Sequence, residues 1–156
     1  MKQNIQLILF MIVIFTSGTV FSQDNGSKAA DKKNNEMSIF LGAISSKDNN
    51  AFSIGLDYQY RINKIIGVGA LAEYATGNFG SLLLGPSLNL HVWHFEFTIA
   101  PTVEFSGNDV AWPLRLGVAY EFELPKGVSI SPAFYFDTER NDDIAVIYGV
   151  EFGFDF

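Results

Sequence analysis

The sequence predicts an all-β protein: an eight-stranded antiparallel up-and-down transmembrane β-barrel. Three observations favour this fold class. Segments of about ten residues alternate large apolar side chains with small or charged ones, and this is the two-residue period of a β-strand. Clusters of turn-forming residues separate the segments. No lysine lies inside any alternating segment, although lysine is common on the exposed faces of soluble strands.

The last segment, 144–156, shows the alternation most clearly. One parity holds only large apolar side chains, namely Ile144, Val146, Tyr148, Val150, Phe152, Phe154 and Phe156. The other parity is mostly small or charged and includes Gly149, Glu151, Gly153 and Asp155. Successive side chains of a strand point to opposite faces, so this strand has one apolar face and one compact polar face.

The same pattern recurs along the chain and predicts eight strands. Their expected ranges are 37–45, 51–62, 65–76, 81–90, 93–105, 111–124, 128–138 and 144–156. Tight turns are expected at Asn63–Lys64, His91–Val92 and Pro125–Lys126–Gly127, and loops near 45–51, 76–80, 106–110 and 138–143. A proline removes a donor from a strand ladder, so bulges or strand ends are expected at Pro86, Pro101, Pro113 and Pro132.

Composition limits the function classes. The 156 residues suit one domain, and only 17% are charged, against about 25% in a typical soluble domain. The formal net charge of −7 argues against nucleic acid as a partner, because a phosphate backbone needs a basic surface. The chain has no cysteine, so it has no disulfide and no thiolate metal ligand.

The N-terminal region has the layout of an export signal. Lys2 precedes an almost wholly apolar run from Ile5 to Phe15, and small and polar residues follow up to Ser22. The apolar run is shorter than the roughly 20 residues that a membrane-spanning helix needs. We therefore predict a cleaved signal peptide over 1–22, a flexible leader over 23–35 and the barrel over 36–156.

Alternation alone also fits a soluble lipocalin-like barrel, so the contents of the two faces must decide. The parity opposite the large residues is rich in glycine, alanine and serine, which suits the narrow interior of eight strands. The aromatic residues of the large parity gather toward the strand ends, as in the aromatic girdles of membrane barrels. Tyr58, Tyr60, Trp93, Phe95, Tyr120, Phe122, Phe154 and Phe156 are expected at one rim, and Phe52, Tyr74, Phe105, Trp112 and Phe136 at the other.

The inward parity also carries charge, and we predict a network of charged side chains in the lumen. Its expected members are Arg115, Arg61, Glu73, Glu96, Glu104, Glu121 and Glu151, together with Asp57, Glu123, Asp137 and Asp155. Ionised groups in a narrow interior need a partner or water. Two arginines cannot pair nine carboxylates, so trapped water is expected, with Arg115 as the central hub.

The chain resembles the small outer-membrane β-barrels of Gram-negative envelopes, the OmpA/OmpX-type or porin-like family. The resemblance rests on the signal peptide, the eight alternating segments and a terminal strand that ends Phe152–Gly153–Phe154–Asp155–Phe156. It implies an outer-membrane location, periplasmic termini, a monomer in contact with outer-membrane lipids, and recognition of Phe152, Phe154 and Phe156 by the barrel-assembly machinery. It also implies that the closing strand pairs with segment 37–45. In that segment Phe40 and Ile44 are large and apolar although their parity should face inward.

Function is less constrained than fold. A packed lumen favours a structural or surface-interaction protein with no cofactor; the alternatives are a narrow small-solute pore, an envelope lipid-modifying enzyme, or a secreted soluble binder of a hydrophobic ligand. His91 and His94 are the only histidines, and both lie near a turn expected on the periplasmic side. A lipid A hydrolase needs its histidine and serine at the outer leaflet, so we predict no catalytic site and no metal site.

Overall fold

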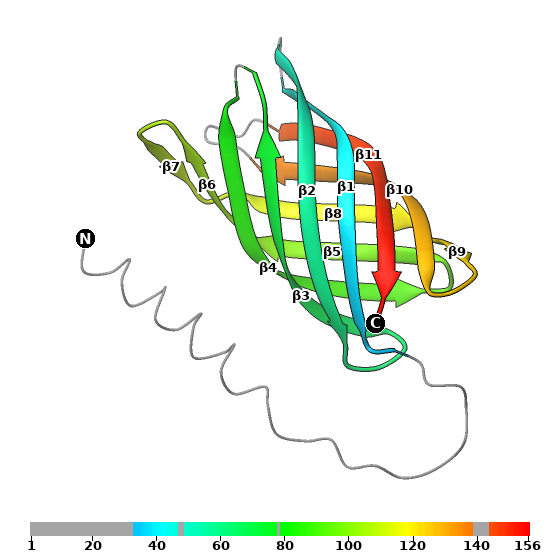
Figure 1. The fold of residues 1–156 in the computed structure, drawn as a ribbon. Helices are drawn as coiled ribbons and strands as arrows, with labels where there is room; N and C mark the ends of the chain where they lie inside the picture. The colour runs from blue at the N-terminus through cyan, green and yellow to red at the C-terminus, as the bar shows by residue number, and fades with distance from the viewer. Residues whose placement is uncertain (1–32, 47–48, 78, 139–143) are drawn as a thin grey trace, which may run out of the picture. The chain divides into compact units, whose positions relative to one another are not determined.

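The computed structural model describes residues 33–46, 49–77, 79–138 and 144–156, and the regular elements in these ranges are β-strands (Figure 1). The strands are β1 (Asn35–Ser46), β2 (Asn49–Arg61), β3 (Ile66–Ala75), β4 (Ser81–Val92), β5 (Phe95–Pro101), β6 (Val103–Ser106), β7 (Asp109–Ala111), β8 (Leu114–Tyr120), β9 (Phe122–Leu124), β10 (Val128–Thr138) and β11 (Ile144–Asp155). Within these ranges no helix has the length and apolar character needed to cross a membrane.

In the described ranges the eleven segments make eight strands of one closed antiparallel barrel. Only Thr102 separates β5 from β6, and short breaks at 112–113 and at Glu121 separate β7, β8 and β9. Each strand pairs with its neighbours in the chain, and β11 returns to pair with β1 from Glu36↔Asp155 to Ser45↔Val146. The predicted fold class is confirmed, and the predicted ranges agree with the observed ones to within a few residues.

The strand registers fix the width of the barrel. Pairing leads once around the barrel from Asn35 through Tyr60, Val68, Leu88, Ile99, Leu116, Phe136 and Val146 back to Ser45. The path returns to β1 ten residues from its start, so the shear is ten. With a rise of about 3.3 Å per residue and a strand spacing of about 4.8 Å, this gives a tilt of about 40° and a radius of about 8 Å. Such an interior has room only for side chains.

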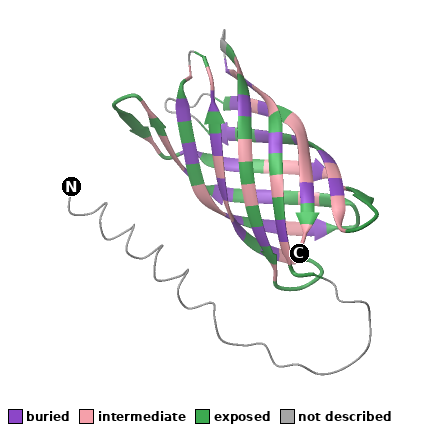
Figure 2. Ribbon diagram, in the orientation of Figure 1, coloured by how far each residue is buried: buried purple, intermediate pink, exposed green. Residues whose placement is uncertain are grey.

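Burial alternates along the strands, as the sequence predicts (Figure 2). In β10 the inward residues are buried from Ser129 to Asp137, and the residues between them face outward. Small inward residues leave space for large ones. A side chain on Gly117 would meet the Tyr135 ring, and one on Gly42 or Gly149 would meet Phe40. The glycine-rich parity therefore accommodates a few large residues that cross the lumen.

The expectation of bulges or strand ends at the prolines is confirmed for Pro101 and Pro113 and wrong for Pro86 and Pro132. Pro86 and Pro132 lie inside the continuous strands β4 and β10, whereas Pro101 ends β5 and Pro113 lies in the break before β8. The β4–β5 and β4–β6 ladders have the same register, and Pro86 and Pro101 lie in the gap between them. The backbone N–H groups that Pro86 and Pro101 lack would therefore fall in the same interruption of the ladder. At the neighbouring break, the Thr102 amide and hydroxyl both donate to the Pro113 carbonyl, at 3.0 and 2.8 Å.

The turn predicted at His91–Val92 is wrong by two residues. β4 continues through Val92, His91 is a buried inward residue, and the turn consists of Trp93 and His94. Trp93, predicted to begin a strand, has a φ of 59° and is 94% exposed. The apolar residues Trp93, Phe95 and Phe97 alternate as in a strand, so the sequence predicted a strand here. A tryptophan in a left-handed turn cannot be told from a strand residue by its type.

The first strand was the weakest part of the pattern, and its inward apolar residues form a core. Phe40 and Ile44 are 5% and 7% exposed and pack with Tyr135, Ile147 and a ring of alanines. The Phe40 and Tyr135 rings meet edge to face, with centroids 5.7 Å apart. The lumen therefore contains an apolar plug next to its charged groups. Most of 1–35 and parts of the outer loops, including the predicted signal peptide, lie outside the described residues.

Replacing Phe40 by alanine should leave a cavity in this plug, because the surrounding strands are fixed by their ladders. We expect Phe40→Ala to lower the free energy of unfolding by about 3–5 kcal/mol. Phe134→Ala removes an equally large but outward-facing ring, 51% exposed, and is the matched control. Urea unfolding in detergent micelles measures both variants. Equal losses for the two would contradict the plug.

Candidate functional site

Charged and polar side chains of the lumen form the candidate site, and Arg115 of β8 lies at its centre. Arg115 is 3% exposed, and its Nε and one terminal nitrogen donate to the two carboxylate oxygens of Asp137 at 2.8 and 2.7 Å. Its other terminal nitrogen donates to Glu73 of β3. The Ser53 hydroxyl donates to the second Glu73 oxygen at 2.5 Å. One guanidinium thus links strands on different sides of the barrel.

The strand registers explain this arrangement. Arg115 and Asp137 are directly opposite in the β8–β10 ladder, so their side chains start side by side and can form a two-point contact. Glu73 lies on β3, which does not pair with β8, so Arg115 reaches it across the lumen. The Arg115 guanidinium carbon also lies 5.1 Å from the centroid of the Tyr135 ring, within cation–π range.

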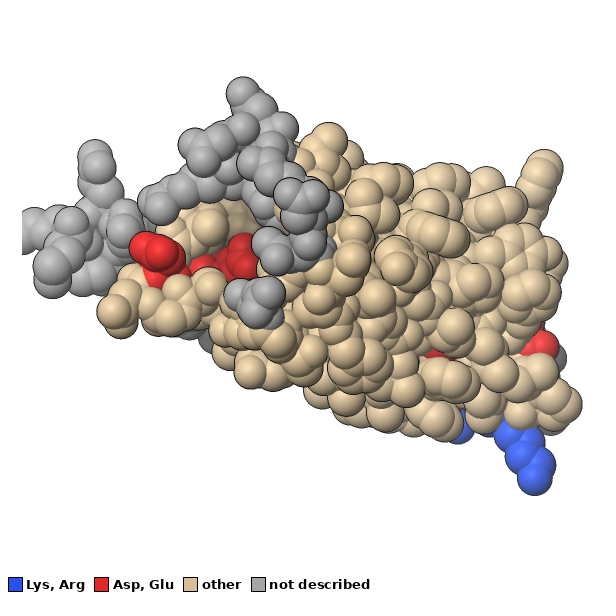
Figure 3. Space-filling model, turned by 90° about the horizontal axis from the view of Figure 1, so that it is seen from above, with Lys and Arg blue, Asp and Glu red and all other residues tan. Residues whose placement is uncertain are grey.

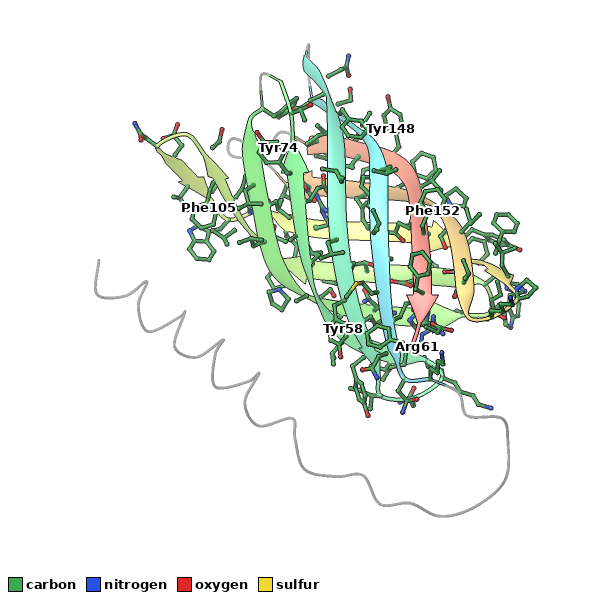
Figure 4. All side chains as sticks on the ribbon, viewed as in Figure 1. Tyr58, Arg61, Tyr74, Phe105, Tyr148 and Phe152 are labelled. Atoms are coloured by element: carbon green, nitrogen blue, oxygen red, sulfur yellow. The ribbon has the colours of Figure 1, made fainter. Side chains whose placement is uncertain are left out.

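Arg61 organises a second group nearer the end of the barrel where the C-terminus lies (Figure 4). It donates to Glu36 at 2.7 Å and to Glu121 at 3.3 Å. The Gln59 amide nitrogen donates to the same Glu36 carboxylate at 3.2 Å. The Gln59 amide oxygen accepts from Nε2 of His91 at 3.0 Å, which places a proton on that nitrogen. The other ring nitrogen of His91 lies 3.8 Å from Glu96.

Between the two arginines lies a small acidic cavity. Its volume is about 10 Å³, and Asp57, Glu96 and Glu151 line it together with Glu36 and several hydroxyl groups. The Tyr135 hydroxyl donates to Glu151. A cavity of this size holds about one water molecule, and carboxylates and hydroxyls can supply its hydrogen bonds.

Two further cavities of about 20 Å³ each lie along the lumen. One is lined by Phe40, Tyr135 and Arg115, and the other by Glu104, Glu73 and Asp137. Each is at most a few water molecules in size. These three cavities are thus each small compared with an open channel.

The structure places the predicted network residues in three groups. Glu73 lies with Arg115, Glu121 lies with Arg61, and Glu96 and Glu151 share the acidic cavity. Glu104 faces the cavity beside Asp137, while Glu123, also expected inside, is exposed at the rim. In the described ranges, no group of three or more His, Asp or Glu side chains is arranged to hold a metal ion.

Sequence reasoning missed three polar members of these groups, namely Gln59, His91 and Glu36. It placed Ser53 on the small inward parity but did not predict its contact with Glu73. Glu36 has the same parity as Phe40, so accepting Phe40 as an inward residue would have placed Glu36 in the lumen. His91 was not assigned to the lumen because the turn was predicted two residues too early, at His91–Val92. His94, the other histidine, lies in the turn against the Tyr120 ring, with centroids 5.7 Å apart.

Removing the Arg115 guanidinium should leave two buried carboxylates without their cation. We expect Arg115→Met to lower the free energy of unfolding by about 3–5 kcal/mol. Adding Glu73→Gln and Asp137→Asn to the same chain should recover most of that loss, because the uncompensated charges are then gone. Urea unfolding of the single and triple variants tests this. A triple variant with a lower free energy of unfolding than Arg115→Met would contradict the charge-pairing role.

Comparison with known proteins extends the description of the fold. No family model matches the chain, and no curated protein matches its sequence. Among solved structures, the attachment invasion locus protein Ail of Yersinia pestis aligns with a TM-score of 0.53 and 12% identity, over 80% of this chain and 99% of Ail. A de novo designed barrel solved by solution NMR aligns with a TM-score of 0.51 and 16% identity, over 80% of this chain and 97% of the design.

A second designed transmembrane β-barrel aligns with a TM-score of 0.52 and 11% identity, over 79% of this chain and 98% of the design. At these identities the likeness concerns the fold alone. Natural and designed membrane barrels share it, and the resemblance seen in the sequence is confirmed at this level. The chain has the fold of the small eight-stranded transmembrane β-barrels to which outer-membrane proteins such as Ail belong.

Proposed function

We propose that the chain is an integral outer-membrane β-barrel protein with a closed lumen and a structural or surface-interaction role. It is exported through the predicted signal peptide, contacts outer-membrane lipids and carries no catalytic site. Its terminal Phe152, Phe154 and Phe156 serve as the recognition signal for the barrel-assembly machinery. We infer that it acts as a monomer.

The observation that carries the proposal is the apolar outer surface. Large apolar side chains are exposed on strands all around the barrel, among them Leu41, Ile54, Val68, Leu88, Ile99, Leu116, Phe134 and Tyr148. A soluble protein rarely exposes one contiguous apolar patch of more than a few hundred Å². A belt of this kind is stable against lipid, where the closed ladders leave no unpaired strand edge.

Aromatic residues border the belt at both ends. Tyr58 lies near the end that holds the C-terminus, whereas Tyr74, Phe105 and Tyr148 lie toward the other end (Figure 4). At the first end the rings contact one another, with centroids 5.0 Å apart for Phe95 and Tyr120 and 4.8 Å for Tyr120 and Phe122. Amphipathic rings favour the headgroup level of a bilayer, so the two groups correspond to its two interfaces.

The contents of the lumen favour a closed barrel over the alternative of a narrow pore. Arg115, Phe40 and Tyr135 cross the interior, and the cavities between them measure only about 10–20 Å³. Open aqueous channels are found in barrels with many more strands. The enzyme alternative lacks support as well, because His91 faces the lumen and bonds to Gln59 instead of facing the outer leaflet with a serine.

The two tryptophans test membrane insertion, since Trp93 and Trp112 lie at opposite rims. Trp112→Phe leaves Trp93 as the single tryptophan, and Trp93→Phe leaves Trp112. In vesicles, the tryptophan fluorescence of both variants should be quenched most strongly by lipids brominated near the headgroup. Depth-dependent fluorescence quenching is the measurement, with unfolded chain in urea as the control. Release of the protein from washed membranes by carbonate alone would contradict insertion and favour the soluble binder.

A closed lumen predicts no steady conductance. In planar bilayers the purified, heat-modifiable barrel should give no single-channel steps, because Arg115 and the Phe40–Tyr135 pair block the path. A variant with Phe40→Ala, Arg115→Ala and Tyr135→Ala, provided it still shows heat-modifiable migration, is the positive control for a widened path. Regular steps from the unmodified barrel would instead support the small-solute pore.

A further inference from the structure

The described lysines all lie at one end of the barrel. Lys33 precedes β1, Lys64 lies in the β2–β3 turn, and Lys126 lies in the β9–β10 turn. We call these three residues, with Trp93 in the β4–β5 turn, the basic rim. The basic rim follows the circumference, because Lys33 lies before the first strand and the other members lie in the three turns that follow at this end. All four side chains are exposed.

Backbone conformation gives a second, independent observation. Trp93 and Lys126 have φ values of 59° and 73°, and they are the two non-glycine residues with positive φ in the described ranges. This region is disfavoured for residues with a Cβ, and hairpin turns normally place glycine or asparagine there. A tryptophan and a lysine at these positions cost conformational energy, so a role for their side chains outside the fold is favoured.

Charge is distributed unevenly between the two ends. Lys64 and Lys126 form no ion pair with other described residues, and Lys33 donates to a backbone carbonyl, that of Asp155. Glu36 and Glu121 at this end are already bound by Arg61, Asp155 is half-buried beside the Gly127 turn, and Glu123 is exposed. Figure 3 shows basic atoms projecting at one end with a few acidic atoms near them, and a larger acidic group toward the other end, on a surface that is otherwise mostly uncharged.

The loops at the opposite end are net acidic in sequence, whereas the exposed charges at the basic rim are three lysines against Glu123. The outer loops hold five acidic residues and two basic ones, namely Asp48, Asp109, Glu139, Asp142 and Asp143 against Lys47 and Arg140. The basic rim is thus the end of the barrel suited to an anionic partner. It lies beside the aromatic group of Phe95, Tyr120 and Phe122, at the level assigned above to a bilayer interface.

We propose that the basic rim binds the headgroups of anionic phospholipids in the leaflet on the side of the chain termini. Each lysine extends along the apolar surface and places its ammonium group at the phosphate level, while Trp93 holds the β4–β5 turn in the interface. The proposal rests on the membrane insertion proposed above and names the lipid class that the barrel prefers.

Lipid selectivity measured by spin-label electron paramagnetic resonance tests the proposal. The chain is folded into phosphatidylcholine vesicles that contain a trace of spin-labelled phosphatidylglycerol or spin-labelled phosphatidylcholine. At low salt, the unmodified chain should prefer phosphatidylglycerol on the order of threefold in the motionally restricted component. A variant that combines Lys33→Gln, Lys64→Gln and Lys126→Gln should lower the ratio of phosphatidylglycerol to phosphatidylcholine binding to about one. Salt at 1 M should have the same effect on the unmodified chain, because it shortens the Debye length to about 3 Å and screens the charges.

Two matched variants separate lipid binding from fold stability. Replacement of the same three lysines by arginine should keep the preference, because the charge remains. Lys126→Gly should relieve the left-handed strain and leave heat-modifiable migration intact, yet reduce the preference. An unchanged preference in the glutamine variant, or none in the unmodified chain, would overturn the proposal. Absence of any restricted component with either lipid would instead show that the barrel is not inserted.

Discussion

The narrow bore of the barrel is the constraint on which the rest of the structure depends. Eight strands with a shear of ten place the walls about 8 Å from the axis, so a single long side chain reaches across the centre. Every large inward residue therefore needs small neighbours. Tyr135 is accommodated by Gly117, and Phe40 by Gly42 and Gly149. The glycine content of the inward parity follows from this packing and not from a need for flexible backbone.

The same bore determines how charge can be buried. A carboxylate in this interior has little bulk water available, so it must receive hydrogen bonds from side chains or from isolated water. Arg115 satisfies Asp137 and Glu73 together, and Arg61 satisfies Glu36 and Glu121. Asp57, Glu96 and Glu151 instead face a cavity of about one water molecule, with the Tyr135 hydroxyl as a donor. The described part of the interior thus contains buried charged groups that have partners in other side chains or face a small cavity.

The fold followed from the sequence because alternation with a period of two over eight segments predicts strands, and the small residues opposite the large apolar ones favoured a membrane barrel over a soluble one. Parity alone also brought Arg115, Glu73 and Asp137 to the interior. It did not predict which groups meet, since contacts across the lumen depend on register and shear, and neither is visible in a single strand. Trp93 and His91 were misplaced for a different reason: an apolar residue in a left-handed turn looks like the next residue of a strand. The roles proposed for Phe152, Phe154 and Phe156 remain predictions.

The closed lumen that we propose would leave interactions to the surfaces of the barrel, and those surfaces are not equivalent. The belt between the two aromatic groups is apolar, so its interaction with lipid tails is non-directional and carries little specificity. Specific recognition needs groups with charge or hydrogen-bonding geometry, and in the part of the chain that the structure describes the exposed charged side chains lie beyond the belt. On the side of the chain termini these groups are three lysines. Lys33 precedes the first strand, whereas Lys64 and Lys126 lie in short turns, and Lys126 has a left-handed backbone conformation. Short turns hold such groups at a fixed depth, which suits a planar array of phosphates better than a partner of irregular shape.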